Sequence, residues 1–322
     1  MTTLRSLLCL FLFAWLPGLS FAWGPIGHMA VDYVAYQQLT SATKTRVGDL
    51  LRLNPEYANW EKQIPPGTSP EDRDMMIFMI AATWADDIKG DPRYSDDGPD
   101  PNTPDGATSS QNIGYGDLFR HRYWHFVDTP FSLDHTPLPA IPVPNAQTQI
   151  IAFRAVLSSS QPNDLKSYDL VWLLHLIGDV HQPLHATARV TQSDSKGDGG
   201  GNKVKLFGDA ASNLHSYWDD LPGADCKFCS DKAGCLNRAI VYGKSLKPAV
   251  PGMGRNTDTA AWIRESFEEA RTTVYETPIG SGDGPYIIVP WSTYDIQAYK
   301  LAQKRIALAG TRLAHVLNHE LK

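Results

Sequence analysis

The chain is poor in cysteine, and this scarcity limits the metal sites and disulfides that it can form. Only four of its 322 residues are cysteines, and Cys9 lies in an apolar leader. The other three are Cys226, Cys229 and Cys235, so a zinc site made of four neighbouring thiolates is excluded. The Cys-x-x-Cys lies in a loop of Gly, Asp and Lys rather than in a βαβ pattern. We therefore expect one local disulfide, with its pairing left open, and one spare thiol.

Long apolar runs are absent after the first residues. The single run lies within residues 1–22, MTTLRSLLCLFLFAWLPGLSFA, and is shorter than the roughly 20 residues that span a bilayer. An early Arg5, a Pro-Gly break and the small Ala22 predict a secretory signal peptide rather than a membrane anchor. The mature protein would then begin at Trp23, form one domain over residues 23–322, and be secreted or periplasmic without a membrane anchor.

The chain also lacks an excess of positive charge. It has 29 Lys and Arg against 35 Asp and Glu, a net charge of −6, which becomes −7 if Arg5 leaves with the leader. A protein that binds nucleic acid through Lys and Arg is normally basic. Attraction for phosphate, if this protein has it, must therefore be concentrated at a local site.

Periodic apolar positions predict an all-α, mainly helical single domain. Apolar residues recur at three- and four-residue spacing near 28–39, 41–53, 71–87, 146–158, 166–182, 259–276 and 293–320. Helix N-cap types stand at Thr40 or Ser41 and at Asn163 or Asp164. Strand-like alternation occurs only at 186–192 and 202–208, which predicts one small β-hairpin. Residues 89–117 predict a long Pro/Gly/Asp surface loop whose spacing does not match an EF-hand.

Ionisable residues interrupt the otherwise apolar stretch WLLHLIGDVHQPLH at 172–185. An unpaired buried polar group costs about 2–7 kcal/mol, and a charge costs more, so these side chains need partners. His175 and Asp179 are four residues apart and share one face of a helix. Pro183 would end that helix and let His185 turn back toward them. Imidazole and carboxylate together suit zinc, although for this stretch alone a satisfied His–Asp pair in the core is nearly as good an interpretation.

The same combination of His and Asp recurs along the chain, always next to aromatic or apolar residues. The further positions are His215 and Asp219 in NLHSYWDD, Asp86 in WADD, His125 and Asp128 in RHRYWHFVD, and His28 in WGPIGH. Half of the ten histidines fall into these settings, which core packing alone does not explain.

Six motifs occur in a fixed order: Trp-Gly-x-x-Gly-His, Trp-Ala-Asp, His-Phe-Val-Asp, His-Leu-Ile-Gly-Asp-Val-His-Gln-Pro-Leu-His, Gly-Gly-Asn and Leu-His-Ser-x-Trp-Asp. Over essentially the whole mature chain this order resembles the S1/P1 nuclease family. The resemblance implies a phospholipase C/P1 nuclease-like helical fold and a monomeric enzyme with three zinc ions. Such enzymes cut single-stranded DNA and RNA to 5′-phosphorylated products and remove 3′-phosphates from nucleotides.

The resemblance also implies which residues bind metal. The first zinc would be held by Asp86, His125, His175 and Asp179, and the second by His185, His215 and Asp219. The third would take the α-amino group and carbonyl oxygen of Trp23, the side chain of His28, and Asp179 as a bridging ligand. Three zinc ions would bring the net charge of the mature chain to about −1.

Four further residues receive roles from the same resemblance. Asp128 would orient the attacking water and Phe126 would stack a base. Asn202 would either contact the edge of the base or stabilise the turn of the hairpin. Lys89 stands where several members carry Arg; it keeps the positive charge but cannot grip phosphate through two parallel hydrogen bonds. Residues 89–117 form a longer loop than in the fungal members and could reshape the rim of the cleft.

The remaining histidines are given no part in the chemistry. His315 and His319 would lie on a solvated helix face, and His181 would make a structural hydrogen bond on the far side of its helix. His121 and His135 stand in polar loops. Among other functions, a zinc-dependent phospholipase C would carry Glu at the last ligand position, so Asp219 and Phe126 favour the nuclease. A periplasmic zinc-binding protein would not need Asp128 beside sites that share Asp179.

Overall fold

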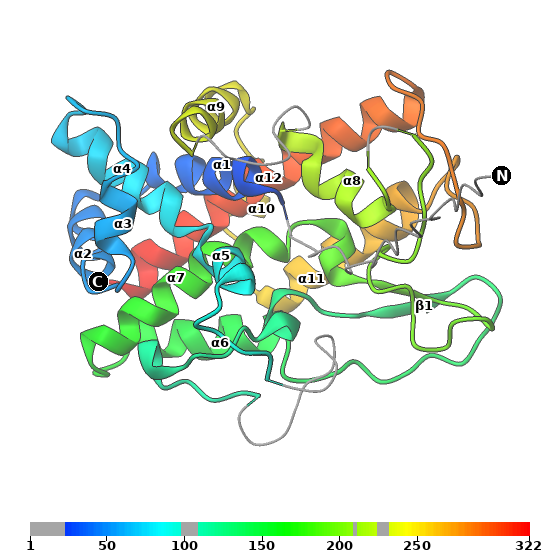
Figure 1. Ribbon diagram of the computed structural model, residues 1–322, viewed down its shortest axis with the longest axis horizontal. Helices are drawn as coiled ribbons and strands as arrows, with labels where there is room; N and C mark the ends of the chain where they lie inside the picture. Colours follow the sequence, from blue (N-terminus) through cyan, green and yellow to red (C-terminus); the bar gives the residue numbers. More distant parts are fainter. Residues whose placement is uncertain (1–22, 98–108, 209–210, 224–231) are drawn as a thin grey trace, which may run out of the picture.

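The computed structural model describes residues 23–97, 109–208, 211–223 and 232–322, and in this part of the chain it confirms the predicted mainly helical fold (Figure 1). The predicted signal peptide at 1–22, together with Cys226 and Cys229, lies outside these residues. The helices are α1 Pro25–Tyr36, α2 Ser41–Leu51, α3 Tyr57–Glu61, α4 Pro70–Ala81, α5 Trp84–Gly90, α6 Ala146–Leu157, α7 Asn163–Asp179, α8 Leu214–Asp220, α9 Lys232–Ser245, α10 Pro251–Gly254, α11 Thr259–Glu269 and α12 Thr293–Glu320. None of the helices in the described ranges is both long and apolar enough to cross a bilayer.

Local sequence explains where several helices begin. The Thr40 hydroxyl accepts a hydrogen bond from the Thr43 backbone N–H at 3.1 Å, so the predicted cap of α2 is confirmed. The α7 cap position is Pro162, one residue before the predicted one, and no side chain there bonds the helix. The predicted helix at 71–87 is divided into α4 and α5, with a break at Ala82 and Thr83.

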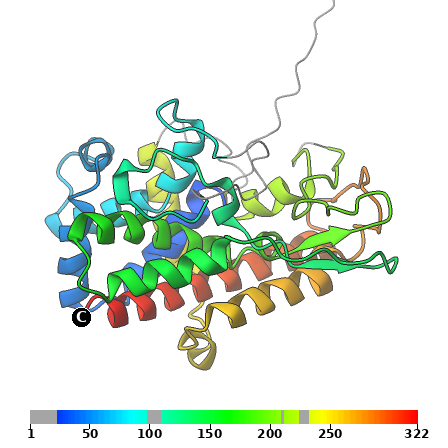
Figure 2. The same ribbon diagram turned by 90° about the horizontal axis from the view of Figure 1, so that it is seen from below.

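Helix α7 is the centre of the fold, and its residues are buried on all sides from Lys166 to Asp179. It packs against α1, α2, α5, α6 and α12, and Figure 2 shows it running beside α12. A helix that is apolar around its whole circumference is typical of a core helix. Where α12 crosses α1, Gly310 allows the close approach, because an added Cβ would lie 2.5 Å from the backbone oxygen of Val31.

The small sheet differs from the predicted hairpin. Strand β1, Pro130–Ser132, pairs in parallel with β2, Ala188–Val190. The other predicted strand does not join this sheet: Lys205 bridges Asn213 and Leu206 bridges Tyr286. Alternating side chains reveal an extended segment with one buried face but not its partner, so the predicted hairpin pairing was wrong.

The described parts of the 89–117 loop are held by His121, a residue that the sequence leaves without a role. His121 is fully buried, and its Nδ1 and Nε2 lie 2.5 Å from Asp97 and 2.9 Å from Asp117. Burial alone lowers the pKa of His121, but the hydrogen bonds to Asp117 and Asp97 raise it overall. Its ring also stacks on Trp124 at 3.6 Å. The loop is therefore anchored through His121 to Trp124, the residue before His125.

Cys235 is buried and forms one half of a disulfide. Its partner lies outside the described residues. Which of the clustered cysteines pairs with Cys235 stays a prediction, because Cys226 and Cys229 lie outside the described residues.

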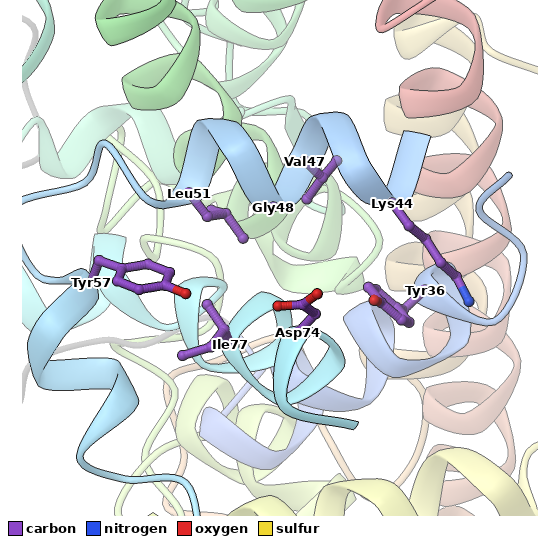
Figure 3. A pocket seen from close by; sticks show the side chains of 8 residues that line it. All are labelled: Tyr36, Lys44, Val47, Gly48, Leu51, Tyr57, Asp74 and Ile77. Atoms are coloured by element: carbon purple, nitrogen blue, oxygen red, sulfur yellow. The ribbon is translucent and has the colours of Figure 1, made fainter. Parts of the chain in front are cut away.

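Figure 3 shows a small cavity between α1, α2 and α4. Its volume is about 10 Å³, which is room for roughly one water molecule. Lys44 lies over the Tyr36 ring, with its Nζ 4.5 Å from the ring centroid. The cavity is lined by Tyr36, Lys44, Val47, Gly48, Leu51, Tyr57, Asp74 and Ile77. It is a packing void of the helical core.

The buried carboxyl of Asp169 destabilises the folded protein as the pH rises. We therefore expect Asp169→Asn to stabilise the protein above about pH 5. The carboxyl is fully buried on α7; its Oδ2 accepts a hydrogen bond from Asn112 at 3.0 Å, while Oδ1 has no partner among the described residues. Burial raises its pKa to about 8, so at pH 7 the group is protonated in the folded protein and ionised in the unfolded chain. Stability therefore falls as pH rises from the unfolded value toward about 8, by up to about 1.4 kcal/mol per pH unit.

Urea unfolding of the wild type and the variant at pH 4.5 and pH 8 measures this effect. The variant should gain at least about 1 kcal/mol over the wild type at pH 8 and little at pH 4.5, because asparagine does not ionise. Comparison at each pH cancels the titration of all other groups. An equal difference at both values would show that Asp169 is ionised in the folded protein.

Candidate metal centre

Buried His and Asp side chains converge at the carboxyl end of α7, in three groups whose ligand atoms lie within 4.8 Å of one another. They come from the start of α1, from α5, from the short helix Arg122–His125, from the end of α7, from the turn Pro183–Ala186 and from α8. The groups are His28, His175 and Asp179; Asp86, His125 and His175; and His185, His215 and Asp219. The structure therefore brings together eight of the nine predicted metal-binding residues by their side chains.

His175 belongs to both of the first two groups, and Asp179 of the first group also contacts His125 of the second. Oδ1 of Asp179 lies 3.3 Å from Nε2 of His175, and its Oδ2 lies 3.0 Å from Nδ1 of His125. Nδ1 of His125 and Nε2 of His175 are only 3.0 Å apart, and Asp86 approaches the latter at 3.5 Å. The two oxygens of this carboxylate therefore approach two imidazoles that belong to one predicted zinc site.

His28 reaches the same place from the second turn of α1. Its Nε2 lies 3.3 Å from Oδ1 of Asp179, and its ring stacks on His175 with centroids 3.9 Å apart. This approach needs Gly178, since a Cβ there would lie 2.9 Å from Nδ1 of His28. The Gly-Asp dipeptide therefore supplies both the carboxylate and the space for the neighbouring imidazole.

The third group joins the turn after α7 to α8. Nε2 of His185 lies 3.0 Å from Nε2 of His215, which is 3.4 Å from Oδ2 of Asp219. Gln182, which the sequence reasoning missed, donates from Nε2 to Oδ1 of Asp219 at 2.7 Å. Its position inside the His-Gln-Pro-Leu-His motif is the one signal that could have identified it.

Backbone carbonyls set the orientation of three of these imidazoles. Nδ1 of His175, His185 and His215 lies 2.7–2.8 Å from the carbonyl oxygens of Ala82, His125 and Gly200 respectively. Each Nδ1 must carry the proton to make this bond, so in the neutral imidazole Nε2 is unprotonated and directed at the cluster. Metal-binding histidines are oriented in this way in proteins. Two unprotonated nitrogens 3.0 Å apart repel each other, so the His185–His215 pair fits a site that holds a cation.

Burial favours the neutral form of most groups at the centre. It lowers the pKa of His215 to about 4 and raises that of Asp179 to about 6. The pKa values of His28, His125 and His185 are lowered well below, and that of Asp219 raised well above, their ordinary values, in each case chiefly by burial. Neutral imidazole is the form that binds metal. Buried carboxylates without a compensating cation are costly, so the donor set fits zinc.

The predicted N-terminal ligand lies beside the third group. Trp23 is fully buried, and the N–H of Gly24 donates to the carbonyl oxygen of Asp219 at 2.8 Å. The main chain at the start of the predicted mature protein is thus fixed against a candidate ligand. The role of its amino group stays a prediction.

Lys89 lies inside the centre and not at its rim. It is 5% exposed, and its Nζ contacts Oδ1 of Asp86 at 2.7 Å. The cation therefore neutralises a candidate metal ligand, while its predicted contact with phosphate stays a prediction.

Phe126 and Asp128 follow His125 in a segment whose backbone is hydrogen-bonded to that of His185. The N–H of Val127 donates to the carbonyl oxygen of His185 at 2.8 Å. Burial, and then the charge of Asp198, raise the pKa of Asp128 to about 7, against a smaller opposite effect of Lys203. Phe126 is partly buried and packs against the core. A carboxyl with a pKa near neutrality, three residues after a candidate metal ligand, is a candidate proton acceptor.

The side-chain amide of Asn202 donates to the carbonyl oxygen of Gly199 at 2.8 Å. This bond stabilises a local turn at 199–202 and not the predicted hairpin, which does not form; contact with a base stays a prediction.

Among the histidines without a predicted part in the chemistry, His181, His315 and His319 lie where they were expected, whereas His121 does not. His181 is buried, its Nδ1 donates to the carbonyl oxygen of Ile177 at 2.7 Å, and Arg312 donates to its Nε2 at 2.9 Å. The predicted structural hydrogen bond is therefore confirmed. His315 is exposed, and His319 lies 3.5 Å from Glu320 on the surface.

The chain is also similar in sequence to known proteins. A family model described as S1/P1 Nuclease matches residues 23–322. The chain is 26% identical to Endonuclease 3 of Arabidopsis thaliana, over 92% of this chain and 88% of that protein. It is 25% identical to Endonuclease 2 of the same plant, over 92% and 89%, and 26% identical to Nuclease S1 of Aspergillus oryzae, over 62% and 54%.

Proposed function

The chain belongs to the S1/P1 nuclease family and is a hydrolase that cleaves nucleic acids, and from this premise we propose that it does so with three zinc ions. The substrates are single-stranded DNA and RNA, which it cuts to 5′-phosphorylated products, and 3′-nucleotides, from which it removes phosphate. The observation that carries the proposal is the gathering of eight buried His and Asp side chains, Asp179 among them, into three groups of possible metal ligands.

By resemblance to the family we assign one zinc to Asp86, His125, His175 and Asp179, one to His185, His215 and Asp219, and one to Trp23, His28 and Asp179; the three groups of buried side chains support this assignment. When bound, closely spaced zinc ions neutralise charge on the phosphate and lower the pKa of water, so that a nucleophile is available near neutral pH. The protein's own contribution is to hold the imidazoles in the correct tautomer through Ala82, His125 and Gly200.

Asp128 acts on the attacking water. Its pKa of about 7 lets its carboxylate accept a hydrogen bond from that water and take up a proton close to neutral pH. The neighbouring Asp198 is held in place by the Tyr275 hydroxyl at 2.8 Å and by backbone N–H donors of Arg189 and Gly201. Burial is the main cause of the raised pKa of Asp128, and Asp198 adds to it.

Phe126 and Asn202 hold the base, and Lys89 contributes positive charge near the phosphate. Stacking on an aromatic ring accepts any base, which suits an enzyme with loose sequence preference. Lys89 is bound to Asp86, so it would act through the charge of the centre rather than by gripping phosphate. We further propose a monomer that is secreted or periplasmic after cleavage of residues 1–22.

The test is to assay purified protein beginning at Trp23 on denatured DNA, RNA, 3′-AMP and phosphatidylcholine, before and after prolonged EDTA treatment. We expect hydrolysis of the first three, about three zinc ions per chain, and loss of both activity and much of the thermal stability on metal removal. The stability should fall because five His and three Asp side chains are left buried without a cation. Added zinc should restore activity.

Two outcomes would assign a different function to the protein. Hydrolysis of phosphatidylcholine alone would identify a phospholipase C, the alternative that Asp219 and Phe126 disfavour. Zinc binding without hydrolysis of any substrate would identify a zinc-binding protein. Full activity in protein free of transition metal would exclude the zinc chemistry itself.

A further inference from the structure

A groove lies outside the metal centre, and none of the candidate metal ligands lines it. It has a volume of about 490 Å³ and lies where α9, α10 and the segment between them face α1 and α12, which pack against one another (Figure 1). Its inner side is apolar, with the buried Tyr33 and Ala307 and the partly buried Leu246. We call it the basic groove, after the side chains at its opening.

The charge of the basic groove differs from that of the whole protein. Residues 232–257, which include its α9 and α10 side, contain five Lys and Arg and no Asp or Glu, in a chain with a net charge of −6. Lys247, Arg255 and His315 line the groove, and no carboxylate does. All three are exposed, and none forms an ion pair or a side-chain hydrogen bond within the part of the chain that the structure describes. A groove lined by unpaired basic groups attracts an anionic partner.

Apolar side chains are exposed at the edge of the same groove. Pro248 and Pro251 line it and are exposed, and beside them Val250 is 64% and Met253 43% exposed. Helix α10 is a single turn that packs on α12, so the sequence PAVPGM at 248–253 forms an apolar bend on the surface. Apolar groups next to basic ones are typical of a surface that enters the boundary between lipid head groups and acyl chains.

These features favour a bilayer over the other anionic partners. Basic groups alone would suffice for a small anion, which leaves the exposed apolar bend without a role. A nucleic acid would need exposed aromatic rings for its bases, and the single aromatic ring among the described residues that line the groove, Tyr33, is buried. The net negative charge is no obstacle, because at about 0.1 M salt charges more than about 10 Å away are screened.

We propose that the basic groove docks the protein on a bilayer of anionic lipids, with lipid phosphates beside Lys247 and Arg255 and the apolar bend 248–253 in the interfacial layer. The docking is peripheral and reversible, since it inserts a few side chains and no helix. It goes beyond the proposed cleavage of nucleic acid and requires none of the candidate metal ligands. A protein docked in this way would be concentrated at the membrane surface.

The test is sedimentation of the protein beginning at Trp23 with vesicles of phosphatidylcholine alone and with vesicles of equal parts of phosphatidylcholine and phosphatidylglycerol. We expect binding to the anionic vesicles only, weakened by added salt. Lys247→Gln and Arg255→Gln should each weaken binding roughly fivefold, the effect of one basic side chain at a charged membrane surface. The matched control is Lys205→Gln, which removes an exposed lysine that lies outside the groove and has no ion pair among the described residues. It should bind like the wild type.

A second readout separates insertion from charge. Met253→Ser should weaken binding several-fold at low and at high salt alike, because the burial of apolar surface in the interfacial layer is not screened by ions. The two charge variants should instead differ from the wild type less as the salt concentration rises. All of the substituted side chains are exposed, so each variant is expected to fold.

Failure of the wild type to bind anionic vesicles, or equal binding by the wild type and the three groove variants, would overturn the inference. Binding of inorganic phosphate that depends on Lys247 and Arg255, without vesicle binding, would assign the groove to a small anion. Binding of single-stranded DNA that depends on the same two residues, again without vesicle binding, would assign it to nucleic acid. Hydrolysis of denatured DNA, measured in solution on the same samples, tests the proposed function separately and should be unchanged in every variant.

Discussion

Replacement of Asp179 by asparagine is expected to abolish hydrolysis of nucleic acid and to lower the zinc content of the purified protein. The carboxylate approaches His175 and His28 at 3.3 Å with Oδ1 and His125 at 3.0 Å with Oδ2. An amide carries no negative charge, and its nitrogen has no lone pair for a metal, so two zinc sites lose a ligand at once. We expect activity to fall by at least about 10,000-fold, the upper end of what the loss of a single proton acceptor causes.

Asp128→Asn is the matched control for this change. It makes the same chemical substitution close to the same ligands, but at a residue that we assign to water and not to zinc. Zinc content, measured by atomic emission, should stay near that of the wild type while kcat falls about 100- to 10,000-fold. Equal metal loss in both variants would show that Asp128 is a ligand.

Extension of the chain by one residue before Trp23 is expected to remove nearly all nuclease activity and about one zinc ion. The nitrogen of Trp23 would then be an amide, whereas a free α-amine, with a pKa of roughly 7.7–8.0, has a lone pair once deprotonated. Metal binding requires the deprotonated ligand. Trp23 is fully buried, and the Gly24 N–H donates to the carbonyl oxygen of Asp219, so the main chain at Trp23 lies beside the third group of candidate ligands.

The appropriate control carries a protease-cleavable tag that leaves Trp23 as the first residue. Activity and the missing zinc should both return when the tag is removed. An extended protein that is as active as the trimmed one, at equal zinc occupancy, would eliminate the N-terminal ligand and with it the three-metal arrangement. If the ligand is correct, protein that retains its leader is inactive until export, which would protect the RNA of the producing cell.

Much of this protein is determined by patterns that act over a few residues. The helical periodicity is local, so α1, α2, α6, α7 and α12 lie close to their predicted ranges. The pairing of His175 with Asp179 and of His215 with Asp219 is equally local, because residues four apart share a helix face. Short helices such as α3 and α8 contain too few turns to show a period, and none was predicted for them.

The tertiary structure alone decided how these local units meet. In the folded protein β2 pairs with β1 and not with residues 202–208. The pairing of an extended segment depends on which other segment buries its inner face. The tertiary structure placed His121 between Asp97 and Asp117, since a polar loop in sequence can still be covered by a neighbouring one. It also brought Gln182 to Asp219 and Tyr217 to Asp295, contacts between segments that are far apart along the chain. Hydrogen bonds of this kind depend on the packing of distant segments, and no spacing of residue types along the sequence encodes them.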